Sequence, residues 1–306
     1  MDWKELTDFT GSLLRSVEPA ERLWHYTDTL GLEGIIRNRS IRLSHPGFLN
    51  DPSELQYAGE VYSHTLSRLG GRGGLEGRFI TGFREYEKTE RSFAPFVASF
   101  CEDKDNLELW RQYGDDGQGF ALGFRMHELQ DRAKLQGQQM GVSDWIYVYK
   151  ILYDESAQHG LASSILNFNF EEYRKICESG EGDNASAIEV VYGSLRTAFD
   201  FFIPFLKHPC YANERENRLV LHGHSVPRSK IQFQARQGYF KPYLDFRIAA
   251  ESRDLPLDTV VLGPSTNSRR REQSVRMFLD RHELGDGQVA IERSSIPYLV
   301  SDRGGT

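Results

Sequence analysis

The sequence predicts an α+β fold in which mixed, largely antiparallel sheets are flanked by helices. Strand-like and helix-like segments alternate along the chain without the steady βαβ rhythm of a doubly wound parallel sheet. The 306 residues also contain no internal repeat and no low-complexity linker. We therefore expect one domain over residues 1–306, since this length suits a single large core.

Four stretches make up this expected domain. An amphipathic helix over residues 1–20 precedes the first half of the core, residues 22–154. A helical insertion over residues 155–206 follows, and residues 207–300 form the second half of the core. Period-two patterns and β-prone runs predict strands over residues 23–27, 41–44, 96–101, 120–124, 145–153, 218–222, 239–247, 259–262 and 289–291.

Helix signals lie between these strands. Asp28 or Thr29 can cap a helix that ends near Asn38, Asp105 can begin a second helix, and residues 268–283 read as a third. The strand over residues 120–124 has large side chains on one face and only glycine and alanine on the other. Such a small face would let a helix or a flat ligand approach the backbone closely.

Composition and net charge limit the classes of partner that this chain is expected to bind. The chain has 39% hydrophobic residues and a net charge of −7, so it is a poor general nucleic-acid binder unless a local basic patch exists. No apolar run approaches the roughly 20 residues of a membrane span, and the first residues do not resemble a signal peptide. Three widely spaced cysteines fit a reducing compartment and form no zinc-type pair. We expect a cytoplasmic protein with no membrane partner and no bound metal.

His25 is the first candidate site residue. It lies inside an apolar strand, beside Tyr26 and Thr27, just before a helix begins. One interpretation is a half-buried histidine that bonds to a backbone carbonyl. The other is a ligand-binding histidine at a strand end, where binding sites often occur.

Residues Asn50 to Glu54 form the second candidate. Asp51 as N-cap, Pro52 at the first helical position and Glu54 at the third are a helix start with a capping box. Capping leaves Asn50 unexplained, and an exposed helix N-terminus can also bind a phosphate group.

Trp110 and Tyr113 are three residues apart and therefore share one helix face. A pair of this kind is usually part of a core. The alternative is that the two rings form a wall for a nucleobase or a nicotinamide.

Glu214, Glu216 and Arg218 would point the same way in an extended strand. Two carboxylates on one face repel each other unless a cation or a ligand lies between them. Arg218 can be that cation, in a surface salt-bridge ladder. Alternatively, one carboxylate bonds a sugar hydroxyl or stabilises a cationic transition state, while the other positions the nucleophile.

Several enzyme classes lose support because their motifs are missing. The chain has no Gly-x-x-x-x-Gly-Lys-Ser/Thr loop, no Gly-x-Gly-x-x-Gly and no Gly-x-Ser-x-Gly elbow. A metal-dependent hydrolase or nuclease stays open as an alternative, with His45, Asp51, Glu54 and His64 as its candidate residues, although their spacing matches no standard metal motif.

In order along residues 22–298, these motifs resemble a family of bacterial domains of unknown function. The matching segments are Trp24-His25-Tyr26-Thr27, Asn50-Asp51-Pro52-Ser53-Glu54, Ser99-Phe100, Trp110-Arg111-Gln112-Tyr113, Gly119 to Phe124, and Lys207 through Glu214-Arg215-Glu216-Asn217-Arg218. Each motif is weak alone, and the ordered set is specific.

A more distant resemblance, to ADP-ribosyltransferases, rests on the aromatic-His strand before a helix with an Ile-Ile pair and on the late Glu-x-Glu. It implies an ADP-ribosyltransferase-like core with a helical insertion and NAD as the substrate. His25 and Thr27 would hold the nicotinamide side, and Tyr113 or Tyr26 would stack on the ring. Glu216 would stabilise the oxocarbenium ion, and Glu214 would position or deprotonate the acceptor.

Three functions follow as hypotheses. The first is a NAD-consuming transferase or glycohydrolase, a toxin or antiviral-defence effector, with a protein or nucleic acid as acceptor. The second is a non-catalytic module of the same fold that senses a nucleotide or a peptide. The third is the metal-dependent hydrolase or nuclease. In the first two, Asn50, Asp51, Trp110 and Arg218 are further candidate contacts for a nucleotide-type small molecule.

Overall fold

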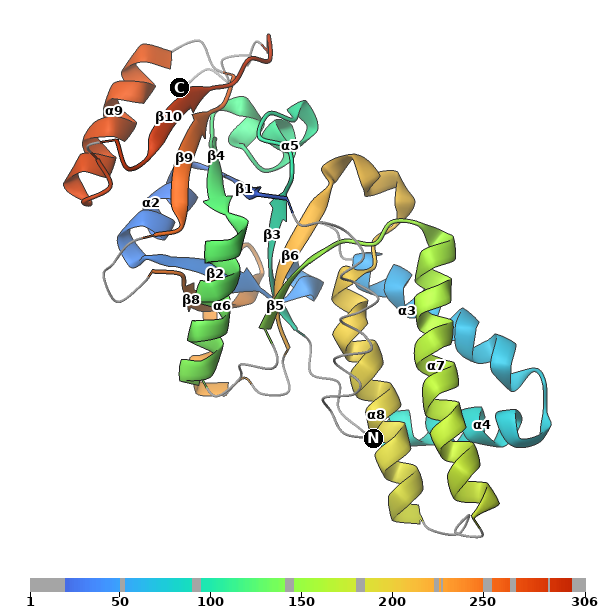
Figure 1. Ribbon diagram of the computed structural model, residues 1–306. Coiled ribbons are helices and arrows are strands. Elements are labelled where there is room, and N and C mark those ends of the chain that lie inside the picture. Colours follow the sequence, from blue (N-terminus) through green and yellow to red (C-terminus); the bar gives the residue numbers. More distant parts are fainter. Residues whose placement is uncertain are drawn as a thin grey trace.

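The structure is a computed structural model. It describes residues 20–49, 53–89, 95–140, 146–179, 185–222, 226, 228–249, 255–264, 268–285 and 287–298. Within this part of the chain, ten strands join in one mixed, mostly antiparallel sheet with helices packed around it (Figure 1). The expected α+β class is therefore confirmed.

The strands are β1 (Arg22–Thr27), β2 (Ser40–Ser44), β3 (Phe96–Cys101), β4 (Phe120–Arg125), β5 (Ile146–Lys150), β6 (Glu216–Leu221), β7 (Gln232–Arg236), β8 (Tyr239–Arg247), β9 (Leu257–Leu262) and β10 (Ala290–Arg293). Their main order is β10-β9-β4-β1-β3-β2-β8-β7, and β6 joins β3 to β5. Only the β9–β10 pair is parallel among the pairs described.

Strand β3 is the branch point of the sheet. One edge of β3 pairs along its whole length with β6, from Phe96 opposite Leu221 to Cys101 opposite Glu216. The other edge meets β1 only at Cys101 and β2 only at Val97. The sheet therefore opens between β1 and β2, and the backbone of Ser99 faces this opening.

The helices are α2 (Thr29–Asn38), α3 (Ser53–Gly70), α4 (Gly74–Thr89), α5 (Leu107–Gln112), α6 (Met126–Met140), α7 (Glu155–Glu178), α8 (Ala185–Phe202) and α9 (Ser268–Arg281). One core lies between one face of the sheet and helices α2, α6 and α9, and includes Phe124, Phe246 and Leu279. A second core joins α3, α4, α7 and α8 and includes Phe79, Phe83 and Phe202. Because neighbouring residues of a strand point to opposite faces, Val97 and Val220 reach this second core from β3 and β6.

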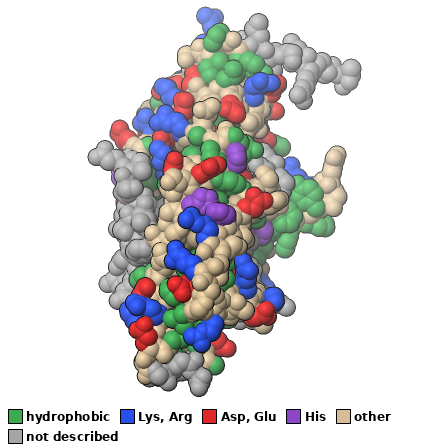
Figure 2. All heavy atoms as spheres, turned by 90° about the vertical axis from the view of Figure 1, so that its right-hand side faces the viewer, with side chains coloured by type: hydrophobic (Ala, Val, Ile, Leu, Met, Phe, Trp, Pro, Cys, Tyr) green, Lys and Arg blue, Asp and Glu red, His purple; other side chains and the backbone are tan. Residues whose placement is uncertain are grey.

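Two stretches distant in sequence build the helical layer to the lower right of Figure 1. Helices α3 and α4 pack against α7 and α8, so the expected insertion over residues 155–206 has residues 53–89 as its partner. Figure 2 looks onto this side, where Lys and Arg side chains are interspersed with Asp and Glu. Such mixing is typical of a solvated surface. No helix in the described residues is long and apolar enough to cross a membrane.

Several expected elements are confirmed with small shifts, two expectations are wrong, and two elements had no prediction. Asn106, not Asp105, caps α5, because the Asp105 carboxylate bonds Ser294 and Ser295 instead. Helix α6 and strand β7 were not expected. Strand β6 begins at Glu216, so Glu214 lies outside it, in a 3-10 turn over Pro209–Glu214. The helix expected over residues 1–20 lies outside the described residues, except for its last position.

The small face of β4 is filled by the chain itself. A Cβ atom at Gly123 would lie 2.7 Å from the Trp24 ring, and one at Gly119 would lie 2.2 Å from the carbonyl oxygen of Thr27. Trp24, Tyr26 and Trp110 form a third core with Ala121 and Val261 at this face. The predicted close approach of a helix is thus confirmed, because α5 carries Leu109 and Trp110, and the Trp24 ring and the Thr27 carbonyl of β1 lie against the glycines.

Candidate functional site

A pocket of about 80 Å³ lies where β1, β3, α5 and the start of β6 meet. Trp24, His25 and Tyr26 line it from β1, and Ser99, Phe100 and Cys101 from β3. Leu109 and Tyr113 come from α5 and the residue that ends it, and Glu214 and Glu216 complete the lining. The pocket therefore brings together the two ends of the predicted site, which are 189 residues apart between His25 and Glu214.

His25 lies on β1 at the opening between β1 and β2, where it faces β3. Its Nδ1 is 2.8 Å from the carbonyl oxygen of Ser99. Because a carbonyl can only accept, Nδ1 carries the proton and donates it, and Nε2 remains an acceptor in the neutral ring. Burial lowers the pKa of His25, which favours this neutral form. Both sequence interpretations are met here, since His25 bonds a backbone carbonyl and also lines the pocket.

Glu216 is buried and fully engaged. Its two oxygens receive a bidentate pair of hydrogen bonds from Arg218, at 2.6 and 3.0 Å, and Lys207 Nζ lies 3.0 Å from Oε2. Its backbone N–H donates to the Tyr153 hydroxyl at 3.0 Å. Burial by itself would raise the pKa of Glu216, but the charges of Arg218 and Lys207 outweigh it and lower the pKa to about 2. Glu216 is therefore a fixed anion.

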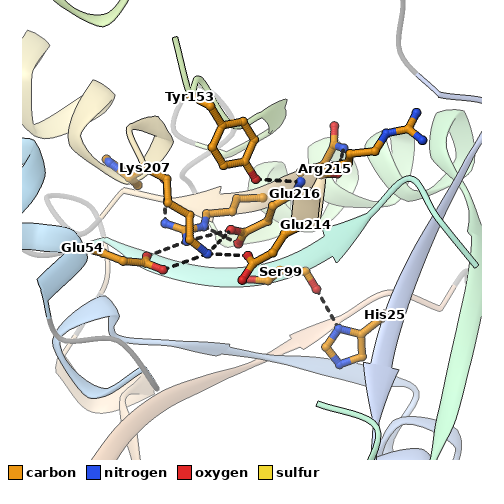
Figure 3. A network of polar contacts seen from close by, with 11 residues as sticks. His25, Glu54, Ser99, Tyr153, Lys207, Glu214, Arg215 and Glu216 are labelled. Carbon is orange, nitrogen blue, oxygen red and sulfur yellow. Dashed lines mark hydrogen bonds and ion pairs between the residues drawn. The ribbon is translucent and has the colours of Figure 1, made fainter. Parts of the chain in front are cut away.

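The Glu214 carboxylate also lies beside Lys207, but it comes from the 3-10 turn before β6 rather than from the strand. Arg215 adopts a left-handed backbone conformation, with φ 45° and ψ 46°, between the 3-10 turn and β6. This bend turns the Glu214 carboxylate toward Lys207, whose Nζ lies 2.5 Å from Oε2 (Figure 3). The two glutamates thus converge, although not because they alternate along one strand. Burial raises the pKa of Glu214, and only the Lys207 charge and hydrogen bond oppose this rise.

Lys207 and Arg218 complete a buried network with a third carboxylate. Glu54, from the first turn of α3, lies 3.1 Å from Lys207 Nζ and 2.6 Å from the Arg218 guanidinium. Arg218 and Lys207 are 2% and 3% exposed, so the surface ladder expected for Arg218 is wrong. The network sets three carboxyl groups, Glu54, Glu214 and Glu216, against two cations, so it has an excess of negative charge when Glu214 is ionised. The pocket is therefore favourable for a cation.

The aromatic wall of the pocket comes from Tyr26, Phe100 and Tyr113. The Tyr26 hydroxyl is committed, since it donates to the Asp103 carbonyl and accepts from the Asn106 N–H, both at 3.0 Å. Tyr113 is 37% exposed and stands at the mouth of the pocket. Burial and the neighbouring Glu214 raise the pKa of Tyr113, so its hydroxyl stays protonated at neutral pH.

Three predicted contacts among the described residues, Arg218, Trp110 and Thr27, do not line the pocket, and Arg218 belongs instead to the buried network. Trp110 is fully buried, donates from Nε1 to Asp105 at 2.8 Å and packs edge-on against Tyr26. Its role as a substrate wall is wrong, because the helix turns this ring inward while Tyr113 stays at the surface. Thr27 is the last residue of β1 and pairs with Phe120 of β4. Asn50 and Asp51 lie outside the described residues.

Three members of this site, Lys207, Ser99 and Glu54, are not predicted as residues of this site by the sequence. Lys207 carried a usable signal, because it directly follows the apolar run Phe201 to Leu206, where a lysine is expected to be buried and paired. Ser99 carried none, since its role depends on the opening between β1 and β2. Glu54 was assigned to a capping box, whereas its carboxylate contacts two cations from distant parts of the chain.

The candidate metal residues do not converge. His45 bonds the Gly47 N–H, His64 packs on His159 with ring centroids 5.0 Å apart, and Glu54 belongs to the buried network. No group of three or more His, Cys, Asp or Glu side chains in the described residues could hold a metal ion. Asp51, the remaining candidate, falls in a stretch that the structure does not describe.

Comparison with known proteins adds one match. Residues 109–219 match the model of a family described as "Protein of unknown function (DUF2971)". Neither the curated proteins nor the solved structures give a match to this chain. The matched stretch contains Tyr113, Lys207, Glu214 and Glu216, whereas His25 precedes it. From α5 to β6, therefore, the chain is similar to a domain family of unknown function, which confirms the resemblance expected over residues 22–298 for this stretch alone.

Proposed function

We propose that this pocket binds the nicotinamide end of NAD⁺ and that the protein breaks the bond between nicotinamide and ribose, as ADP-ribosyltransferases and NAD glycohydrolases do. The observation that carries the proposal is the juxtaposition of a neutral His25 with Glu214 and Glu216 around one narrow, aromatic-walled pocket. The distant sequence resemblance to ADP-ribosyltransferases agrees with this assignment.

The charge of the site supports a cationic substrate. The pyridinium ring of NAD⁺ is flat and positively charged, and the buried network next to the pocket has one carboxylate more than it has cations. Tyr113 and Phe100 supply ring faces and edges against which such a ring can pack. A pocket of about 80 Å³ accommodates a small group, so the rest of the dinucleotide would lie outside it along Tyr113.

The proposed reaction divides the work between the two glutamates. The C1′–N bond breaks, its electron pair leaves with nicotinamide, and positive charge develops on the ribose. The pKa of Glu216 is lowered to about 2, so its carboxylate is ionised at neutral pH and stabilises this positive charge throughout the reaction. The oxygen of water or of an acceptor then bonds to C1′. Glu214, whose pKa burial raises, takes the proton from that nucleophile.

His25 has a positioning role in this proposal. Its Nδ1–H is held by Ser99, so Nε2 can accept a hydrogen bond from a ribose hydroxyl or from the carboxamide N–H of nicotinamide. The Ser99 carbonyl thus fixes the ring orientation, in the way that a partner on one nitrogen of a histidine sets the role of the other.

The test measures nicotinamide release from NAD⁺ by the purified chain, with chromatographic detection. Glu214→Gln and Glu216→Gln should each lower the rate at least about 100-fold, as removal of a catalytic carboxylate or oxyanion-type group does. Glu172→Gln is a matched control, because Glu172 pairs with Lys175 on the surface of α7. Full activity in both site variants, or no NAD⁺ binding by calorimetry, would refute the proposal.

A nucleotide-sensing module without turnover is the second candidate. It is favoured by one observation, namely that Lys207 and Arg218 already occupy both oxygens of Glu216. In that case NAD⁺ or another nucleotide would bind without nicotinamide release, and Glu214→Gln would change its affinity alone. Growth arrest on expression, relieved by Glu216→Gln, would favour the enzyme and a toxin or antiviral-defence role with a protein or nucleic-acid acceptor.

A further inference from the structure

The β7–β8 hairpin exposes more aromatic surface than any other described element. Phe233, Tyr239 and Phe240 are 62%, 48% and 68% exposed. Strand β7 ends the described strand order, so the hairpin has a partner strand on one side only. Large rings at this exposure are uncommon unless they contact a ligand or a partner.

The charge of the same segment is opposite to that of the chain. Residues 226–244 contain four basic side chains, Arg228, Lys230, Arg236 and Lys241, and no aspartate or glutamate, although the net charge of the chain is −7. Arg228, Lys230 and Arg236 are exposed. Burial and the neighbouring charge of Arg236 lower the pKa of Lys241, which indicates a local excess of positive charge. An anionic partner would relieve this repulsion.

The two faces of the hairpin carry different side chains. Arg236 pairs with Tyr239 and Gln234 with Lys241, so amide, cation and ring share one face near the tip. The Arg42 guanidinium pairs with Asp245 at 3.6 Å and lies over the Tyr243 ring at 4.5 Å on this face, and Phe48 stacks on Tyr239 at 5.9 Å. On the opposite face, Phe240 lies across from Ala235 and Phe233 across from Pro242.

We infer that the β7–β8 hairpin is a binding surface for single-stranded nucleic acid. Unpaired bases would stack on Phe233 and Phe240, which share one face of the hairpin, and Arg228, Lys230 and Arg236 would contact the phosphates along the free edge of β7. Exposed rings favour a single strand over a duplex, whose bases are already stacked. Three glutamines, Gln232, Gln234 and Gln237, argue against a membrane-inserted tip, because their amides would lose their hydrogen bonds to water there.

This inference is independent of the NAD⁺ proposal, since the hairpin residues do not line the pocket. The test is fluorescence anisotropy with labelled 20-nucleotide oligo(dT), oligo(rU) and a mixed-sequence DNA duplex, without NAD⁺. We expect binding of one or both single strands, at least about tenfold tighter than the duplex. With three phosphate contacts, the affinity should fall with salt at a logarithmic slope of about −2. The DNA and RNA arms identify the physiological strand.

Variants separate the two kinds of contact. Phe240→Ala should weaken single-strand binding about tenfold with little change in salt dependence, because it removes a stacking ring. Lys230→Glu should weaken binding and reduce the salt slope by about one or more. Lys88→Glu is the matched control, because Lys88 is exposed on α4, which packs in the helical layer with α3, α7 and α8.

Four results would overturn the inference. The first is no oligonucleotide binding at 50 mM salt, and the second is duplex binding as tight as single-strand binding. The third is unchanged affinity in folded Lys230→Glu. The fourth is association with phosphatidylserine vesicles, or dimerisation through β7, in the absence of oligonucleotide binding. Circular dichroism establishes that each variant is folded before its affinity is compared.

Discussion

The ammonium of Lys207 lies 2.5 Å from Glu214 and 3.0 Å from Glu216, so one buried cation joins both carboxylates of the pocket. The same ammonium lies 3.1 Å from Glu54, which belongs to the helical layer. Lys207 is therefore the point at which the sheet, the helical layer and the candidate site meet. Burial would lower the pKa of Lys207, but the three carboxylates outweigh burial and raise it.

Replacing Lys207 should cost more stability than replacing a surface lysine. Lys207→Met leaves the buried Glu214 without its cation and leaves Glu54 and Glu216 paired with Arg218 alone, and breaking a buried pair from one side costs about 3–5 kcal/mol. Urea unfolding measures the loss. Lys175→Met, which breaks only the exposed pair with Glu172, should stay within about 0.5 kcal/mol of the parent. Equal effects of the two substitutions would contradict the structure.

Glu216 should make the chain sensitive to acid. Its pKa is lowered from 4.5 to about 2, so its stabilising contribution is present above pH 4.5 and is lost as the pH falls toward 2. The full contribution is about 3 kcal/mol, because one pKa unit corresponds to about 1.4 kcal/mol. The free energy of unfolding, measured from pH 2 to 6, should therefore fall more steeply in the parent than in Glu216→Gln. Parallel curves would argue against the paired state of Glu216.

Glu214 should act in the opposite direction. Its pKa is raised in the folded chain, so the folded state binds its proton more readily than the unfolded state does. Glu214→Gln should therefore remove a loss of stability that sets in as the pH rises above 4.5. A comparison of Glu214→Gln with Glu216→Gln over the same pH range should show opposite changes in slope.

His25 should be neutral, with its proton on Nδ1, at pH 7. Its pKa is lowered from 6.5 by burial, and the Ser99 carbonyl accepts from Nδ1. Nitrogen chemical shifts of the imidazole report the tautomer directly, and the His25→Gln spectrum assigns the signals. Because the folded pKa is the lower one, this residue's contribution to stability is present above pH 6.5 and is lost as the pH falls. An Nε2–H tautomer, or titration at 6.5 or above, would contradict the geometry.

Asp105 should tie the last described segment to α5. Its carboxylate accepts from the Ser294 hydroxyl, the Ser295 hydroxyl and N–H, and Trp110 Nε1. Asp105→Asn should weaken these bonds and lower amide-exchange protection over residues 294–298, with a stability loss of about 1–3 kcal/mol. Asp131→Asn, at an exposed position of α6, is the control and should change neither quantity.

Local sequence signals placed most elements correctly, since they depend on neighbouring residues. Asp28 caps α2 and accepts from the Gly31 N–H at 2.7 Å, as its place before an apolar-periodic run predicted. Alternation located β4, and β-prone runs located β1, β3 and β8. The same signals failed for Asp105 and Glu214, because hydrogen bonds and ion pairs to distant residues decided their conformations.

The sequence by itself determined the α+β class, the strand that carries His25 and the presence of two nearby glutamates that need a cation. Only the tertiary structure decided which cations they receive, that the network is buried, and that His25 meets them across an opening in the sheet. The physical reason is the sequence separation between the residues that interact. Capping and strand alternation act over a few residues, whereas Lys207, Glu54 and Ser99 reach the site only when β3, β6 and α3 pack together.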